Sequence, residues 1–288
     1  MSVVLDALDR GRSLSFEFYP PKTPAGEQRL SRTIDELESI GPDFVSVPYG
    51  AGGTTRARTR DTVIEICAER RFPAMPHLTC VGQTRAELEQ LVDDYATHGV
   101  DHLLALAGDP PPDDRDGGDP GELHHARELV QLVKERTDMT VAVAVHPEIH
   151  PRSTSRAMDR RHLADKLAVA DFAITQFFFD STDYARLVGE VAAFGAVTPV
   201  IPGIMPVINP ASVKRFADLN GTRTPPELWA RVEQAADAAE RLEVAVDAAC
   251  ELIEAVLAIG APGVHLYTLN DPAATRLICE RAGLGQAG

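Results

Sequence analysis

Short apolar runs along the chain alternate with stretches whose apolar residues recur at spacings of three and four. The first pattern predicts buried strands, and the second, as at Leu30, Ile34 and Leu37, predicts amphipathic helices. Strands are expected at residues 14–18, 44–47, 74–79, 103–106, 141–145, 171–176, 200–201 and 264–267. Helices are expected at residues 30–40, 60–70, 84–98, 122–136, 157–168, 183–194, 210–219, 225–257 (in more than one piece) and 272–282.

This order of elements predicts an α/β fold in which one domain, residues 1–288, forms a single (β/α)8 TIM-type barrel. Such barrels usually take about 250 residues, which is close to the length of this chain. An open, doubly wound sheet is the structural alternative. No Gly-x-Gly-x-x-Gly motif follows the first strand, so a dinucleotide-binding unit of that second fold has no support.

Polar residues follow most of the expected strands at the point where the apolar run ends. A parallel barrel builds its active site at the carboxyl ends of its strands, so these side chains are expected to form one site. They are Glu17, Tyr49, His77, Asp109, His146, Gln176 and Tyr267.

Glu17 lies between Phe16 and Phe18, an unusual place for a carboxylate. Burial among aromatic rings disfavours the charged form and raises a carboxyl pKa. A general acid needs such a pKa to act near neutrality, so Glu17 is the expected catalytic residue. The alternative is a structural carboxylate that hydrogen-bonds to a neighbouring strand.

The other strand-end residues each have two interpretations. Asp109 could accept hydrogen bonds from an amino-heterocycle, or it could be a turn aspartate before proline. Gln176 could read the edge of a planar heterocycle or satisfy a backbone group. Phe177 could support a ligand plane or belong to the core. His77 is as well explained by a satisfied core position as by a ligand contact.

Charge and composition exclude several classes of function. The formal net charge is −15, whereas a nucleic-acid-binding protein needs a basic surface. No apolar stretch is long enough to cross a bilayer, and residues 1–12 lack the apolar centre of a signal peptide. The sequence therefore predicts a cytoplasmic protein with a small-molecule substrate. Helix faces used for packing and for subunit contact look alike, so a homo-oligomer stays open.

Metal binding has little support in the sequence. The four cysteines are not spaced as metal ligands or as a disulfide framework. His146, Glu148 and His150 are close in sequence, but Pro147 and Pro151 place them on a loop without a further ligand set. No metal is therefore predicted.

Several motifs, taken together and in this order, resemble the methylenetetrahydrofolate reductase family from about residue 14 to about residue 284. Each motif alone is a weak signal, but the series is specific. The motifs are SFEFYPPKT at 15–23, PHLTC at 76–80, GDPP at 108–111, PEIHP at 147–151, ITQFFFD at 174–180, PGIMP at 202–206 and YTLN at 267–270.

The resemblance implies a β/α barrel that reduces 5,10-methylenetetrahydrofolate to 5-methyltetrahydrofolate. It implies that Glu17 helps to protonate and open the five-membered ring of the substrate. Asp109 and Gln176 would hold the pterin. The substrate-binding positions implied in this way are Asp109, Gln176, Phe177 and Tyr267, and those beside the cofactor are Tyr49, His77, His146, Asp159 and Lys166.

The chain departs from the family pattern where the family binds its usual FAD. Pro48 replaces a threonine, Ala107 replaces an arginine, His146 replaces a tyrosine, and the segment 166–171 is one residue shorter. These changes predict a retained folate site without flavin, in which NADH or NADPH delivers hydride directly. The alternatives are FAD held by altered contacts, a deazaflavin in the same barrel, and a non-catalytic folate-binding barrel.

Overall fold

The computed structural model describes residues 2–21, 23–49, 56–108 and 121–285. Within these ranges a single parallel sheet has the strand order β7-β6-β5-β4-β3-β2-β1-β9-β8. The strands are β1 (Ser13–Glu17), β2 (Phe44–Val47), β3 (Ala74–Thr79), β4 (His102–Leu106), β5 (Thr140–Val145), β6 (Phe172–Thr175), β7 (Val200–Ile201), β8 (Gly203–Ile204) and β9 (Gly263–Tyr267).

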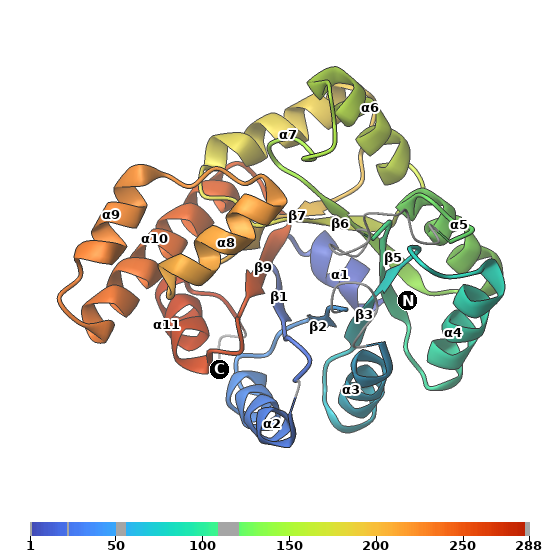
Figure 1. The fold of residues 1–288 in the computed structure, drawn as a ribbon, viewed down its shortest axis with the longest axis horizontal. Coiled ribbons are helices and arrows are strands. Elements are labelled where there is room, and N and C mark those ends of the chain that lie inside the picture. The colour runs from blue at the N-terminus through green and yellow to red at the C-terminus, as the bar shows by residue number, and fades with distance from the viewer. Residues whose placement is uncertain (1, 22, 50–55, 109–120, 286–288) are drawn as a thin grey trace.

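Helices surround this sheet (Figure 1). They are α1 (Val3–Asp9), α2 (Pro24–Glu38), α3 (Arg56–Glu69), α4 (Arg85–Thr97), α5 (Ala126–Arg136), α6 (Arg156–Leu167), α7 (Ser181–Ala193), α8 (Pro210–Asn220), α9 (Pro226–Gln234), α10 (Ala238–Ala258) and α11 (Pro272–Ala282). In the described part of the chain no helix is long and apolar enough to span a membrane.

The sheet closes on itself through a strand that Pro202 interrupts. Val200 of β7 pairs with Ala173 of β6, and Gly203 of β8 pairs with His265 of β9. Pro202 has no N–H to donate, but its carbonyl accepts from the His265 backbone N at 3.0 Å. β7 and β8 thus act as one strand position, and the predicted (β/α)8 TIM-type barrel is confirmed.

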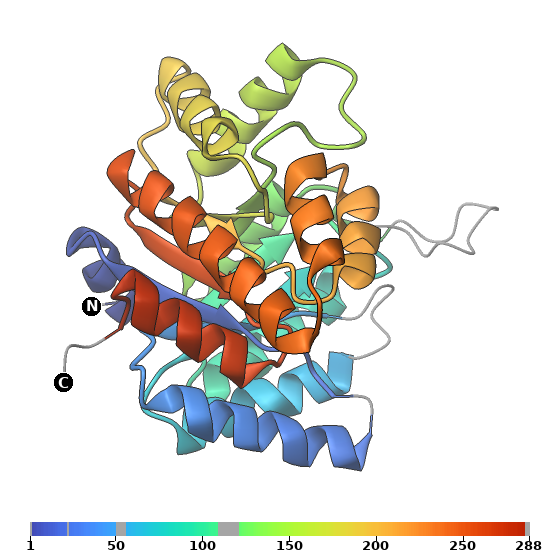
Figure 2. The same cartoon turned by 90° about the vertical axis from the view of Figure 1, so that its left-hand side faces the viewer.

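The helix α1 was not expected from the sequence. Its Val4 and Leu8 are buried in a cluster with Phe44 and Leu104, which come from inside the barrel. The Ser2 hydroxyl also lies 3.0 Å from Nε2 of His102, at the start of β4. The helix therefore covers the amino end of the barrel, with α8 and α9, drawn in orange, toward the other end (Figure 2).

Other helical boundaries also differ from the expectation: α2 begins at Pro24 instead of residue 30, and α3 begins at Arg56 instead of residue 60. The helix expected at 122–136 begins only at Ala126, because the Glu128 carboxylate accepts from the backbone N–H groups of His124 and His125 just before it. The expected break within 225–257 lies between Gln234 and Ala238, where the Asp237 side chain caps α10.

The strands are buried on both faces, as a barrel covered by helices requires. One apolar cluster fills the space between the strands and the helices, and a smaller one fills the barrel interior. A third cluster, which includes Phe177, Met205, Trp229 and Tyr267, lies beneath α8 and α9. This third cluster supports the carboxyl end of the barrel, where the polar residues gather.

Candidate active site

A cavity of about 240 Å³ opens at the carboxyl ends of the strands. Six of the predicted site residues line it: Glu17, Tyr49, His77, Gln176, Phe177 and Tyr267. They come from the ends of β1, β3 and β9 and from the segments that follow β2 and β6. Residues far apart in the chain therefore meet at one place, as the barrel expectation required. Asp109, also predicted here, lies outside the described residues.

Glu17 is the last residue of β1 and is only 4% exposed. Its backbone is held by the Thr268 hydroxyl, which donates to the Glu17 carbonyl at 2.7 Å. Burial raises the pKa of the Glu17 carboxyl from 4.5 to about 8, although a hydrogen bond with Tyr19 partly opposes the shift. Glu17 is therefore mainly a neutral carboxylic acid at pH 7, the form that can donate a proton.

His77 lies beside that acid. Its Nε2 lies 3.5 Å from Glu17 Oε2, but it forms no hydrogen bond with any described side chain or backbone atom. Burial lowers the pKa of His77 to about 3. Since burial drives the two pKa values in opposite directions, the pair is a neutral acid beside a neutral imidazole, not an ion pair.

Phe177 and Tyr267 form an aromatic wall. Their rings meet edge to face at a centroid distance of 6.1 Å. The Tyr267 hydroxyl donates to the Thr175 carbonyl at 2.9 Å. The hydroxyl is therefore bonded to the barrel, and the ring of Tyr267 lines the cavity. Such a wall suits a flat heterocyclic ligand.

Gln176 follows β6 and brings a polar side chain to the same cavity. Its backbone N–H donates to the Val145 carbonyl at 2.7 Å, which fixes the start of the loop after β6. Its side-chain Oε1 accepts from Asn220 Nδ2 at 3.3 Å. Asn220 also lines the cavity, although no pattern in the sequence marks it as a site residue.

His146, Asp159 and Lys166 form a separate group around β5 and α6, and none of the three lines the described cavity. Burial lowers the pKa of Lys166 to about 8, and its Nζ donates to the Ala144 carbonyl at 2.6 Å. Burial likewise lowers the pKa of His146 to about 3. Asp159 accepts from the His150 backbone N at 3.2 Å.

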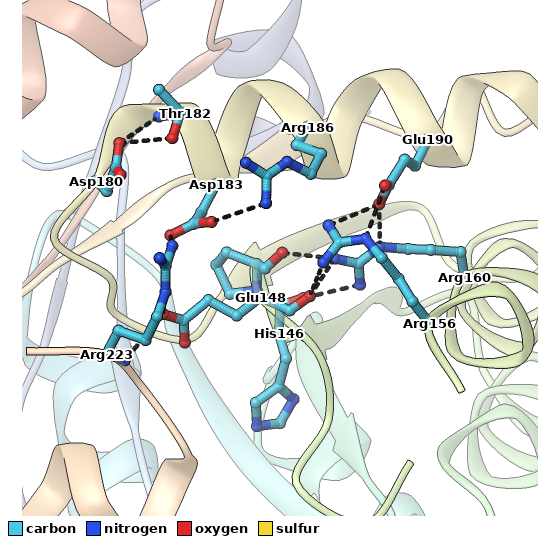
Figure 3. A network of polar contacts seen from close by, with 11 residues as sticks. His146, Glu148, Arg156, Arg160, Asp180, Thr182, Asp183, Arg186, Glu190 and Arg223 are labelled. Atoms are coloured by element: carbon cyan, nitrogen blue, oxygen red, sulfur yellow. Dashed lines mark hydrogen bonds and ion pairs between the residues drawn. The ribbon is translucent and has the colours of Figure 1, made fainter. Parts of the chain in front are cut away.

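Arg160 holds the loop between β5 and α6, which carries His146 (Figure 3). Its guanidinium is 2% exposed and donates to the backbone carbonyls of His146, Pro147 and Glu148 at 3.2, 2.5 and 2.7 Å. Its Nε donates to Glu190 on α7 at 2.8 Å. The side chain therefore fixes the loop between β5 and α6 and is not free to meet a phosphate.

The spacing of residues along α6 indicates that Arg160 is buried, although its charge suggests a surface position. The buried face of α6 consists of Arg160, Leu163, Ala164 and Leu167, at spacings of three and four. An arginine in phase with apolar positions indicates burial with partners. The described residues include no group of three or more His, Cys, Asp or Glu side chains that could hold a metal ion.

Comparison with known proteins adds a family to this geometry. The family model described as methylenetetrahydrofolate reductase matches residues 4–283. The 5,10-methylenetetrahydrofolate reductase of Salmonella typhimurium is 39% identical over 274 residues, which cover 94% of this chain and 91% of that protein. The enzyme of the same name from Escherichia coli is 38% identical with the same coverage.

Two further similarities differ in extent. A protein of Arabidopsis thaliana named methylenetetrahydrofolate reductase (NADH) 1 is 33% identical over 90% of this chain and 46% of its own length. An uncharacterized protein of Clostridium thermocellum, described as binding two copies of 5-methyl-5,6,7,8-tetrahydrofolic acid, superposes with a TM-score of 0.70 over 98% of this chain and 99% of that one. At 14% identity, this second likeness shows the fold alone.

Proposed function

The chain belongs to the methylenetetrahydrofolate reductase family, and on that premise we propose that it reduces 5,10-methylenetetrahydrofolate to 5-methyltetrahydrofolate, with Glu17 as the proton donor. The observation that carries the proposal is a buried carboxyl group with a pKa near 8, at the end of β1 in a cavity with aromatic and amide walls. A pure binding site has little need of a carboxylic acid kept neutral at pH 7.

The role of Glu17 follows from the chemistry of the substrate. A proton from Glu17 passes to N10 as the bond between N10 and the methylene carbon breaks, and the electrons of that bond stay on N10. The methylene carbon is left as an iminium on N5, beside the carboxylate that has just formed. In a site screened from water this carboxylate stabilises the developing cation. Glu17 then regains a proton from solvent.

The neutral state of His77 supports this sequence of events. A protonated imidazole 3.5 Å from Glu17 would lower the pKa of the carboxyl group and would repel the iminium. Because burial keeps His77 uncharged near neutral pH, neither effect arises. Gln176, Phe177 and Tyr267 would hold the pterin, with Asp109 as the further substrate contact that the family resemblance implies.

We infer that FAD, the usual cofactor of the family, is not held at this cavity, because the described lining residues offer no cationic side chain. No lysine or arginine is found among the described residues that line the cavity. Reduced flavin carries negative charge on its ring, which positive groups around it would stabilise. Lys166 donates to the Ala144 carbonyl at 2.6 Å and does not line the cavity, and Pro48, which does line it, has no hydroxyl.

A reduced nicotinamide carries no charge on its ring, so a cavity lined without cationic side chains can accommodate it. We therefore infer that NADH or NADPH gives its hydride directly to the methylene carbon. Tyr49, His77, His146, Asp159 and Lys166 are proposed on the side of the hydride donor. The Arabidopsis relative, which is named for NADH, is consistent with the choice of NADH.

Two measurements test this proposal. The purified protein should be colourless, and its oxidation of NADH should depend on methylenetetrahydrofolate without added flavin. A stoichiometric yellow chromophore needed for turnover would overturn direct transfer. Glu17→Gln should abolish turnover and still bind 5-methyltetrahydrofolate in calorimetry. Full activity of that variant would remove Glu17 as proton donor, and binding without turnover in the wild type would indicate a non-catalytic folate-binding barrel.

A further inference from the structure

The last residue of α8 and the three residues that follow it, 220–223, place three donor side chains on the loops after β5 and β6. Asn220 Nδ2 donates to Gln176 Oε1 at 3.3 Å, and the Thr222 hydroxyl donates to the Phe177 carbonyl at 3.3 Å. Arg223 Nε donates to Glu148 Oε1 at 3.1 Å. One segment of four residues thus contacts the loops that follow both β5 and β6.

The backbone of this segment is itself fixed. Gly221 ends α8 in the left-handed conformation with φ +69°, and the Thr222 N–H donates to the Ala217 carbonyl at 2.9 Å. A Cβ at Gly221 would lie 3.1 Å from Pro151 Cγ, so the segment packs closely on the loop after β5. Arg223 Nη2 adds an ion pair of 2.6 Å with the buried Asp183 of α7 (Figure 3). The backbone that carries Asn220 is therefore held in place by the residues that follow it.

The bond between Asn220 and Gln176 has a consequence for recognition. A glutamine amide offers an acceptor at Oε1 and two donor hydrogens at Nε2. When Oε1 accepts from Asn220, the Nε2 hydrogens remain for a ligand. Among the described residues, the bond from Asn220 is the one side-chain hydrogen bond of Gln176, so no other contact distinguishes Oε1 from Nε2.

We propose that Asn220 is a positioning residue that fixes the orientation of the Gln176 amide, so that the pterin edge placed against it must be a hydrogen-bond acceptor. This inference rests on the proposed function. In a reduced pterin the acceptors are the C4 carbonyl oxygen and N1, whereas N3, N8 and the 2-amino group carry hydrogens. Gln176 therefore selects the C4 carbonyl or N1, and the donor edge is left to another acceptor of the site.

The test reverses the direction of the hydrogen bond between residue 220 and Gln176, so that Gln176 becomes the donor, and it leaves Gln176 in place. In Asn220→Asp the carboxylate can only accept, so it draws the Nε2 hydrogens of Gln176 toward itself and turns Oε1 to the ligand. Oxygen then faces oxygen, which a polar site tolerates poorly. Asn220→Leu removes the bond, keeps the volume similar, and leaves Gln176 free to rotate. Asn209→Asp, at the N-cap of the same helix, makes the same change of charge where aspartate caps equally well.

The readout is the Kd of 5-methyltetrahydrofolate by calorimetry, with a thermal melt of each variant to verify folding. Asn220→Asp should weaken binding by about tenfold or more, Asn220→Leu by about threefold, and Asn209→Asp by less than twofold. Equal losses in the two Asn220 variants, or none in Asn220→Asp, would overturn the positioning role while leaving the proposed function intact. A wild-type protein that binds no folate would overturn both.

Should Asn220→Asp fail to fold, Gln176→Glu gives the same readout from the other partner. Its carboxylate accepts from Asn220 as before but offers the ligand no donor at physiological pH. The proposal then expects a loss similar to that of Asn220→Asp, and unchanged affinity would contradict it.

Discussion

Replacing Glu17 by glutamine should stabilise the ligand-free protein above pH 5, because the wild type keeps a buried proton that its unfolded chain releases. The carboxyl pKa is 4.5 in the reference state and about 8 in the folded protein. Between these values the folded state binds more protons than the unfolded state. The stability of the wild type therefore falls as pH rises, by up to about 1.4 kcal/mol per pH unit. Glutamine resembles the neutral acid in shape and has no proton to release.

The size of the effect follows from the two pKa values. Integrated from pH 5 to pH 7.5, the linkage amounts to roughly 3 kcal/mol. The difference in unfolding free energy between Glu17→Gln and the wild type should grow by this amount over that range. Titrating groups distant from Glu17 are common to both proteins, so their contributions cancel in the difference.

Urea unfolding of both proteins at pH 5, 6, 6.8 and 7.5, without ligand, measures this difference. Glu254→Gln makes the same substitution at an exposed position of α10 and serves as the matched control. A gap between Glu17→Gln and the wild type that stays constant from pH 5 to pH 7.5 would refute the reasoning, since it would place the Glu17 pKa near its ordinary value. A gap of the opposite slope would show that the carboxylate is stabilised in the folded state.

Three further outcomes are expected. The kcat/KM of the reductase should fall about tenfold per pH unit above the Glu17 pKa of about 8, because the protonated carboxyl group that donates the proton disappears. A kcat/KM that stays constant up to pH 9.5 would exclude a rate-limiting proton transfer from Glu17. Gly203→Ala should lower the free energy of unfolding by about 2 kcal/mol or more, since the new Cβ would lie 2.4 Å from the Thr175 carbonyl oxygen. The control Gly189→Ala, in open space on α7, should raise the free energy of unfolding by about 0.5–1 kcal/mol. Urea midpoints compare the two variants, and equal effects would contradict the tight closure of the barrel at Gly203. Arg160→Met should lower the free energy of unfolding by about 3 kcal/mol or more in the same urea assay, because three backbone carbonyls lose their hydrogen-bond donor. A loss below about 1 kcal/mol would show that water replaces the guanidinium as donor.

The strand positions and the barrel were predictable because they depend on local patterns. Apolar runs of four to six residues separated by helical periodicities leave few topologies, and short connections with a right-handed crossover order the strands around a barrel. The burial of Glu17 was likewise predictable, since its two phenylalanine neighbours indicate a buried strand, and burial raises the pKa of a carboxyl group. The cavity positions of Gln176, Phe177 and Tyr267 followed from their places just at or after strand ends.

Other features depend on contacts between distant segments, which no local pattern encodes. The helix α1 has only seven residues, too few for a clear periodicity, and it is stabilised by the barrel that it covers. Arg160 is charged like its sequence neighbours, and only the folded chain brings its carbonyl partners, 12 to 14 residues away in sequence, around it. The pairing of Asn220 with Gln176 joins residues 44 positions apart.

The order of the amino acids determines which segments become strands, and therefore which side chains stand at the mouth of the barrel. The folded chain decides what state those side chains are in. Glu17 is a neutral acid and His77 a neutral base because the surrounding elements remove water from both. That exclusion of water is a collective property of the closed barrel, since no residue near either one in sequence could produce it alone.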